Sequence, residues 1–156
     1  MRRYLLLAAC ALLPIASFGA AAFTFTDGTH ADCVARGEMV VEIDAPPGHM
    51  IYQIGYTGIT APAESGYRIT WNVKKLHSLP PAVHDFIFFH ECAHARIPTG
   101  DELRANCAGL KDMREAGRAG FAVEAKLAAF YGPGNDYWAR TLECANAEGV
   151  SPARKK

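Results

Sequence analysis

The chain has 156 residues, of which 50% are hydrophobic and 21% charged, and its 16 basic and 16 acidic side chains leave no formal net charge. This length supports a single domain with a hydrophobic core. Without an excess of basic residues there is no positive field to hold a phosphate backbone, so the composition argues against a nucleic-acid partner.

The first 22 residues have the order of a secretory signal peptide. Arg2 and Arg3 precede an apolar run from Tyr4 to Phe18, and small residues follow, with Ala20 and Ala22 forming an A-x-A cleavage site. We therefore predict cleavage after Ala22. The mature protein is then periplasmic or secreted, with no stable insertion in the membrane.

Two other interpretations of the N-terminus remain open. The segment Leu7–Cys10, LAAC, resembles a lipoprotein cleavage box, although the apolar run continues well past Cys10. Alternatively the segment is never cleaved and stays as an anchor, although the run is short for a membrane span. We predict a signal peptide over residues 1–22, one domain over 23–150, and a polar, basic tail over 151–156.

Four cysteines remain after the predicted cleavage: Cys33, Cys92, Cys107 and Cys144. An even number in an exported chain predicts two disulfides, for which three connectivities exist. Four buried free thiols are the alternative. No C-x-x-C pair occurs, which argues against a zinc site built on cysteine.

The domain divides by composition into an N-terminal half with strands and a C-terminal half with helices. Strands are predicted in three segments rich in β-branched and aromatic residues, Glu38–Ile43, Met50–Gly58 and Tyr67–Val73, with turns at residues 45–49 and 61–66. Helices are predicted from about Pro80 to Ile97, Asp101 to Gly117, Ala119 to Tyr131, and Asp136 to Ala147. The predicted fold class is α+β, with a small, mostly antiparallel sheet.

The first predicted helix carries the sequence HECAH. His90 and His94 are four residues apart, so their side chains lie on one helix face and can bind one metal ion. Glu91 lies about 100° around the helix from His90, where it borders the metal face and can act as a base. This is the H-E-x-x-H pattern of zinc enzymes. The alternative is an ordinary amphipathic helix with two half-buried histidines.

A third protein ligand is expected from the start of the next helix. Asp101 and Glu102 both come close to His94 if residues 98–100 reverse the chain. Glu102 has a competing interpretation, in which Thr99 is the N-cap and Glu102 completes a capping box three residues later. Asp101 could also be only a first-turn carboxylate.

HECAH followed by ELRAN resembles the gluzincin branch of the zincin metallopeptidases, over residues 87–107. The resemblance implies zinc ligands at His90, His94 and Glu102, and a catalytic base at Glu91. It favours Glu102 over Asp101. The family carries an aspartate where this chain has Asn106, which can still accept a hydrogen bond from a ligating histidine but without the charge. The chain also departs from the family at Arg96, where an apolar residue is usual.

The predicted function is that of an exported zinc-dependent metallopeptidase-like hydrolase, which uses a zinc-bound water and a glutamate base on peptide or protein substrates. The first alternative is a non-catalytic periplasmic protein with a structural or partner-binding zinc site. The second is a disulfide-linked helical domain without metal. The sequence predicts no oligomeric state.

Some side chains around the motif have less specific predictions. Cys92 points away from the metal face, which favours a bridge to Cys33 or Cys144 and argues mildly against one to Cys107. His84 is predicted at the surface. The residues that flank the last predicted loop could stabilise an oxyanion, but none is preferred over a packing or surface role: Tyr131, Tyr137 and Arg140.

Overall fold

The computed structural model describes residues 22–147, so the predicted signal peptide lies outside the described residues except for Ala22, as does the tail over 151–156. The strands are β1 (Phe23–Thr24), β2 (His30–Ala31), β3 (Val34–Ala35), β4 (Glu38–Met39), β5 (Val41–Asp44), β6 (Gly58–Ala63) and β7 (Gly66–Trp71). The helices are α1 (Met50–Ile54), α2 (Val73–Leu76), α3 (Pro81–Arg96), α4 (Glu102–Glu115), α5 (Phe121–Tyr131) and α6 (Asp136–Asn146). This arrangement confirms the predicted α+β class.

The strands form two short antiparallel pairs and one three-stranded sheet. β1 pairs with β2, β3 pairs with β4, and the larger sheet has the order β5-β7-β6. β6 and β7 form an antiparallel hairpin, whereas β5 pairs with β7 in parallel. β6 is therefore an edge strand of this sheet.

Two details of the predicted strands are wrong. The segment Met50–Gly58 was expected as one strand, but its first five residues form α1. The side chain of His49 accepts a hydrogen bond from the amide of Ile51, and Gly55 ends the helix in the left-handed conformation, with φ of 70°. These two caps outweigh the β-propensity of the segment. The turn expected over 61–66 is also shorter, because β6 continues to Ala63.

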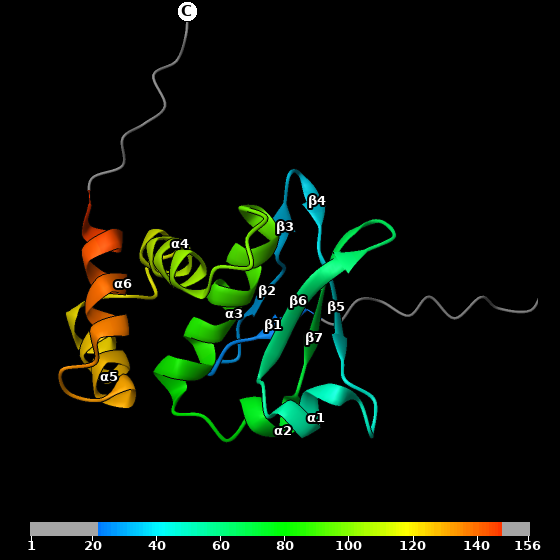
Figure 1. The fold of residues 1–156 in the computed structure, drawn as a ribbon, viewed down its shortest axis with the longest axis horizontal. Coiled ribbons are helices and arrows are strands. Elements are labelled where there is room, and N and C mark those ends of the chain that lie inside the picture. Colours follow the sequence, from blue (N-terminus) through cyan, green and yellow to red (C-terminus); the bar gives the residue numbers. More distant parts are fainter. Residues whose placement is uncertain (1–21, 148–156) are drawn as a thin grey trace, which may run out of the picture.

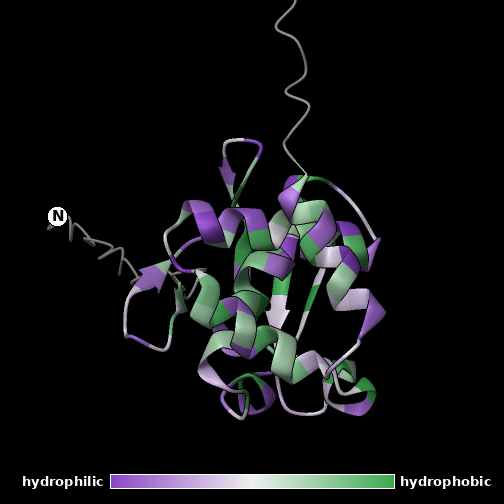
Figure 2. Ribbon diagram, turned by 90° about the vertical axis from the view of Figure 1, so that its left-hand side faces the viewer, coloured by the Kyte–Doolittle hydropathy of each residue, from purple (hydrophilic) through white to green (hydrophobic). Residues whose placement is uncertain are grey.

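Helix α3 lies in the centre of the molecule. In Figure 1 the strands lie on one side of it and α4, α5 and α6 on the other. Thirteen of its 16 residues are buried, which is the expected state of a helix that is covered all round. Figure 2 shows that hydrophilic and hydrophobic residues alternate along the outer helices, which face solvent on one side.

Prolines determine where α3 begins and where it ends. Pro81 occupies the first helical turn, where no amide hydrogen is required. At the other end Ile97 leaves the helical conformation with φ of −106° and ψ of 24°, because Pro98 follows it. The next helix then starts after a short turn, which brings the beginning of α4 beside the end of α3.

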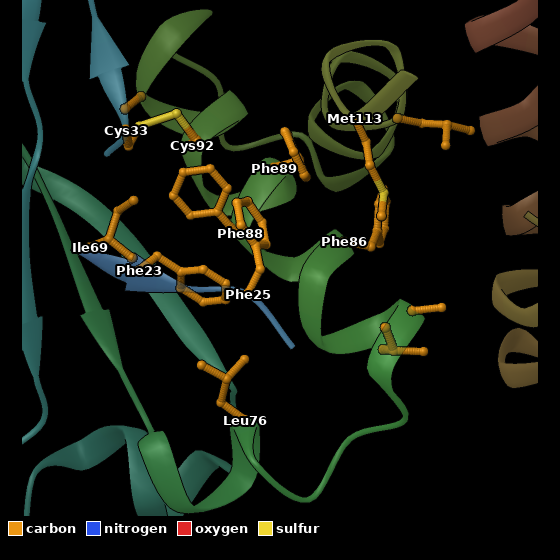
Figure 3. Packing of buried hydrophobic residues seen from close by; sticks show 14 of the residues in the cluster. Phe23, Phe25, Cys33, Ile69, Leu76, Phe86, Phe88, Phe89, Cys92 and Met113 are labelled. Carbon is orange, nitrogen blue, oxygen red and sulfur yellow. A yellow bond between two sulfur atoms is a disulfide. The ribbon is translucent and has the colours of Figure 1, made fainter. Parts of the chain in front are cut away.

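The core on the strand side of α3 is aromatic. Figure 3 shows Phe23 and Phe25 of the N-terminal segment gathered against Phe88 of α3. The ring centroid of Phe88 lies 4.9 Å from that of Phe23 and 5.3 Å from that of Phe25. Burial of each such ring stabilises the fold by about 1.5–3 kcal/mol. The segment that follows the predicted cleavage site thus belongs to the core.

The N-terminal segment also buries His84, which was predicted to lie at the surface. His84 is 5% exposed, and its Nδ1 lies 3.0 Å from Oδ1 of Asp85. Asp85 in turn accepts hydrogen bonds from the amide and the hydroxyl of Thr26, at 2.9 and 3.1 Å. The prediction failed because the covering segment is about sixty residues away in the sequence.

The four cysteines form two disulfides, Cys33–Cys92 and Cys107–Cys144. The first joins the residue just before β3 to the side of α3, as Figure 3 shows, and the second joins α4 to α6. The predicted number of bridges is confirmed, and so is the expectation that Cys92 does not pair with Cys107. Two bridges are typical of a protein that folds in an oxidising compartment. None of the helices within residues 22–147 has the length and apolar character that a membrane span requires.

Candidate metal centre

The helical spacing of the two motif histidines brings their rings together inside the protein. His90 and His94 are each 8% exposed, and their ring centroids lie 4.7 Å apart. Their Nε2 atoms are separated by only 3.2 Å. The two nitrogens therefore face the same small volume, as the sequence pattern predicted.

The other nitrogen of each ring is held by an oxygen. Nδ1 of His90 lies 2.6 Å from Oδ1 of Asn106, and Nδ1 of His94 lies 2.7 Å from the backbone oxygen of Thr99. An amide or carbonyl oxygen can only accept a hydrogen bond, so each Nδ1 carries the hydrogen and donates it. In the neutral ring Nε2 then has a free lone pair, which is the state that a metal ligand needs.

Glu102 completes a triangle of donor atoms. Its Oε2 lies 3.1 Å from Nε2 of His90 and 3.6 Å from Nε2 of His94. A tetrahedral zinc ion with bonds of 2.0–2.1 Å holds its ligand atoms about 3.3 Å apart. The three atoms lie within 4.8 Å of one another and belong to residues that can hold a metal ion. Three lone pairs that converge in this way need a cation or protons between them.

The local turn decides between the two candidate third ligands. Asp101, not Thr99, is the N-cap of α4, since its Oδ1 accepts from the amides of Leu103 and Arg104 at 2.9 and 3.1 Å. The competing interpretation, a capping box of Thr99 and Glu102, is therefore excluded. Because Asp101 serves the helix end, Glu102 is the first helical residue and faces the histidines.

Neighbouring groups shift the pKa values of His90 and Glu102 in opposite directions. Burial lowers the pKa of His90, but the hydrogen bond that Glu102 accepts from it and the charges of Glu91 and Glu102 outweigh this effect, so the pKa lies above the usual range. The hydrogen bond with His90 lowers the pKa of Glu102. A proton on Nε2 of His90 would be donated to Oε2 of Glu102, 3.1 Å away.

Glu91 lies beside the donor triangle without belonging to it. The side chain is 7% exposed, and burial raises its pKa, although the charges of His90 and His94 act in the opposite direction. The hydroxyl of Thr60 lies 2.8 Å from Oε2 of Glu91 and 2.8 Å from its backbone oxygen. This contact orients the carboxylate and leaves Oε1 without a protein partner among the described residues.

Two glycines make the close packing around the centre possible. A Cβ atom on Gly58 would lie 2.9 Å from Cγ of Glu91, so only glycine leaves room for this side chain. A Cβ on Gly109 of α4 would lie 2.9 Å from the backbone of Phe89 and His90. The close approach of α4 to α3 at Gly109 is what allows Asn106 to reach His90.

The donor atoms open into a cavity of about 490 Å³. Its lining residues come from the start of β6 and the turn before it, from α2, from α3 and from the α3–α4 turn: Gly55, Tyr56, Thr57, Gly58, Ile59, Thr60, Lys75, Ile87, His90, Glu91, His94, Thr99, Gly100 and Glu102. Glu102 is 63% exposed in its side chain, so the centre is accessible from this cavity. The donor residues and Glu91 thus line the same cavity.

The structure brings the four predicted site residues together, and it adds two that the sequence did not single out, Thr60 and Gly58. No sequence signal marks either one, because β6 is about thirty residues from the motif. The possible oxyanion residues Tyr131, Tyr137 and Arg140 do not line the cavity. Tyr131 stacks on Trp138 with 5.0 Å between centroids. Burial, followed by the charge of Glu102, raises the pKa of Tyr137 to about 12.

Arg96, at the position where the family pattern has an apolar residue, is exposed and forms an ion pair with Asp112 of α4. It lies outside the cavity, so the departure from the pattern does not alter the donor set. No family model, curated protein or solved structure matches this chain. The candidate centre therefore stands on its own geometry.

Proposed function

We propose that this protein is an exported, zinc-dependent hydrolase that acts on peptide bonds. The observation that carries the proposal is the placement of Glu91. A buried carboxylate borders three convergent donor atoms, and all four groups face a cavity that is open to solvent. A purely structural metal site is closed and has no need of an acid–base group or of an accessible cavity.

The donor set favours zinc. Two imidazole nitrogens and one carboxylate oxygen, His90, His94 and Glu102, would hold the ion and leave its fourth position toward the cavity. Zinc bound there supplies a Lewis acid that makes water acidic near neutral pH and polarises a carbonyl group. The backbone oxygen of Thr99 and the amide of Asn106 keep the two rings in the correct tautomer.

Glu91 is proposed to move the proton. Thr60 fixes Oε2, so Oε1 is the atom that can accept a proton from water and return it to the departing amine. Burial raises the pKa of this carboxyl, which brings it nearer to the value that a general base needs at neutral pH. Gly58 keeps the space into which the carboxylate must fit.

The predicted export is consistent with the two disulfides. Both bridges require an oxidising environment. Together with the signal-peptide pattern of residues 1–22 they support a periplasmic or secreted location. A peptidase in such a compartment would meet unfolded or extended polypeptides, which are the substrates that we propose.

The test compares two glutamates that differ in role. Glu91→Gln should fold, keep one zinc ion per chain and lose peptide cleavage by about 10²–10⁴-fold, which is the usual cost of losing a general base. Glu102→Gln replaces a charged ligand by a weak neutral one and should lose the zinc itself. Glu64→Gln, at an exposed turn between β6 and β7, is the matched control.

Metal content is measured by elemental analysis of purified protein, and activity by cleavage of casein and of a generic peptide library. A Glu91→Gln variant that cleaves as fast as the unmodified protein refutes the base. Protein that holds zinc but cleaves no peptide supports the non-catalytic metal-binding alternative. Protein that takes up no zinc after dialysis against the ion refutes the centre altogether.

A further inference from the structure

The cavity beside the candidate metal centre has two chemically different ends. In Figure 1 α1 and α2 lie at one end of β6, whereas α3 runs along this strand toward the α3–α4 turn at the other end. Gly55 and Lys75 line the cavity at the end formed by α1 and α2, and Thr99 and Gly100 line it at the α3–α4 turn. A bound chain that follows β6 would pass from one end to the other.

Lys75 is the one lysine or arginine among the lining residues, all of which belong to the described part of the chain. The other charged side chains of the lining are Glu91 and Glu102, both at the metal centre. The two positive charges of a zinc ion at the centre would offset the charges of Glu91 and Glu102. Lys75 is then the cationic side chain that can attract an anionic group at the α2 end of the cavity.

The cation at this end has no internal partner. No carboxylate within residues 22–147 forms a salt bridge with Lys75. Its Nζ lies 3.5 Å from the position that a Cβ on residue 55 would take, and Gly55 has no side chain to cover it. The left-handed conformation of Gly55 follows from its role as the C-cap of α1. The same glycine therefore ends the helix and leaves the ammonium group open to the cavity.

We propose that Lys75 is a specificity-determining residue that binds a carboxylate of the substrate. The inference rests on the proposed function and names its substrate class, which is peptides that carry a negative charge at a distance from the bond that is cut. The carboxylate is either an aspartate or glutamate side chain or the C-terminus of the peptide. Tyr56, which lines the same end and is 58% exposed, offers an aromatic surface to the stem of that residue.

The experiment uses the zinc-loaded protein and a set of peptides with one common sequence. A single glutamate or glutamine is moved through each position, and each peptide is made with a free and with an amidated C-terminus. We expect kcat/KM to be about two- to fivefold higher for one glutamate position, or for the free C-terminus, which is the range of a solvent-accessible charge pair. The preference should shrink at high salt.

Lys75→Met should remove this preference, and Lys75→Glu should reverse it. The matched control is Lys74→Met, because Lys74 is exposed on the same helix but does not line the cavity, and it should keep the full preference. A preference that survives in Lys75→Met, or that is absent from the unmodified protein, overturns the proposal.

Failure of the proposed function is distinguishable from failure of this inference. If the protein cleaves none of the peptides, the peptidase proposal is refuted, but the role of Lys75 can still be tested by peptide binding. In that case the same glutamate and glutamine peptides are compared by equilibrium binding to the zinc-loaded protein. Tighter binding of the glutamate peptide that Lys75→Met abolishes supports the role of Lys75, and equal binding of both peptides refutes it.

Discussion

Helix α3 carries two buried groups of histidine and carboxylate, and they differ in how their polar atoms are satisfied. At its N-terminal end His84 and Asp85 form a closed group, in which Thr26 donates two hydrogen bonds to the carboxylate. At its C-terminal end His90 and His94 turn lone pairs toward each other and toward a third acceptor.

The comparison teaches that burial of a histidine does not by itself identify a site. The hydrogen-bond partners of the buried polar atoms do identify a site, because acceptor atoms converge without donors only where a cation or a proton is expected between them. His84 has a neighbouring carboxylate and a covering strand, and it lies away from the cavity that contains the centre. Its group attaches the segment that follows β1 to α3, whereas the other group could hold a metal ion.

The largest expected effect separates the two histidine groups directly. His90→Ala removes one of three protein ligands, so zinc affinity should fall by at least about a thousandfold. His84→Ala should keep stoichiometric zinc and lower only the stability, by about 1–3 kcal/mol, since it leaves polar groups of the closed group without a partner. Elemental analysis and urea unfolding measure the two quantities. Equal zinc loss in both variants would contradict the distinction.

A second prediction concerns the closed group. Asp85→Asn keeps one acceptor oxygen but loses the charge that receives hydrogen bonds from Thr26. We expect a loss of about 2 kcal/mol in the free energy of unfolding, with zinc content unchanged. The loss should disappear in a background in which the N-terminal segment is already detached by Phe23→Asp, because the two changes act on one contact. Loss of zinc from Asp85→Asn would show that the two groups are coupled.

A third prediction concerns the support of His90. Asn106→Leu removes the acceptor for Nδ1 of His90 and should weaken zinc binding by about 10–100-fold. The variant also leaves Nδ1 of the buried His90 without an acceptor, so the metal-free protein should lose about 1–3 kcal/mol in the free energy of unfolding. Asn106→Asp is the matched control, since it keeps the acceptor and should bind zinc at least as tightly. Competition with a chromogenic chelator gives both affinities.

The sequence predicted most of what is local in this structure. The bounds of α3 follow from Pro81 and Pro98, and the motif spacing placed His90 and His94 on one face. These predictions succeeded because each depends on residues within one or two helical turns, where backbone geometry leaves few alternatives.

The contacts that the sequence did not predict are those between distant segments. Thr60 reaches Glu91 across 31 residues, and β5 pairs with β7 in parallel, neither of which leaves a local pattern. The choice between Asp101 and Glu102 depended on which residue takes the helix cap, and both are compatible with the composition of the turn. Packing decided these points, and packing is the part of the fold that a single sequence specifies least directly.

The smallest expected effect is a dependence on pH that metal should reverse. In the metal-free protein the pKa of His90 lies above its ordinary value and that of Glu102 below it. A raised pKa in the folded state means that His90 contributes stability below its unfolded pKa of about 6.5, and that this contribution is lost as pH rises through the folded value. The lowered pKa of Glu102 gives a contribution above about 4.5, which is lost as pH falls through its folded value.

Metal-free protein should therefore have a higher Tm at pH 6 than at pH 8, because the stabilising contribution of protonated His90 is lost as pH rises through its raised pKa. With zinc the trend is opposite, because protons compete with the ion for Nε2 of both histidines and the stabilisation by bound metal grows with pH. Thermal unfolding in chelator and in excess zinc measures both curves. His90→Gln is the control in which the metal-free trend should be flatter. Parallel curves with and without zinc would show that no cation replaces the proton between these residues.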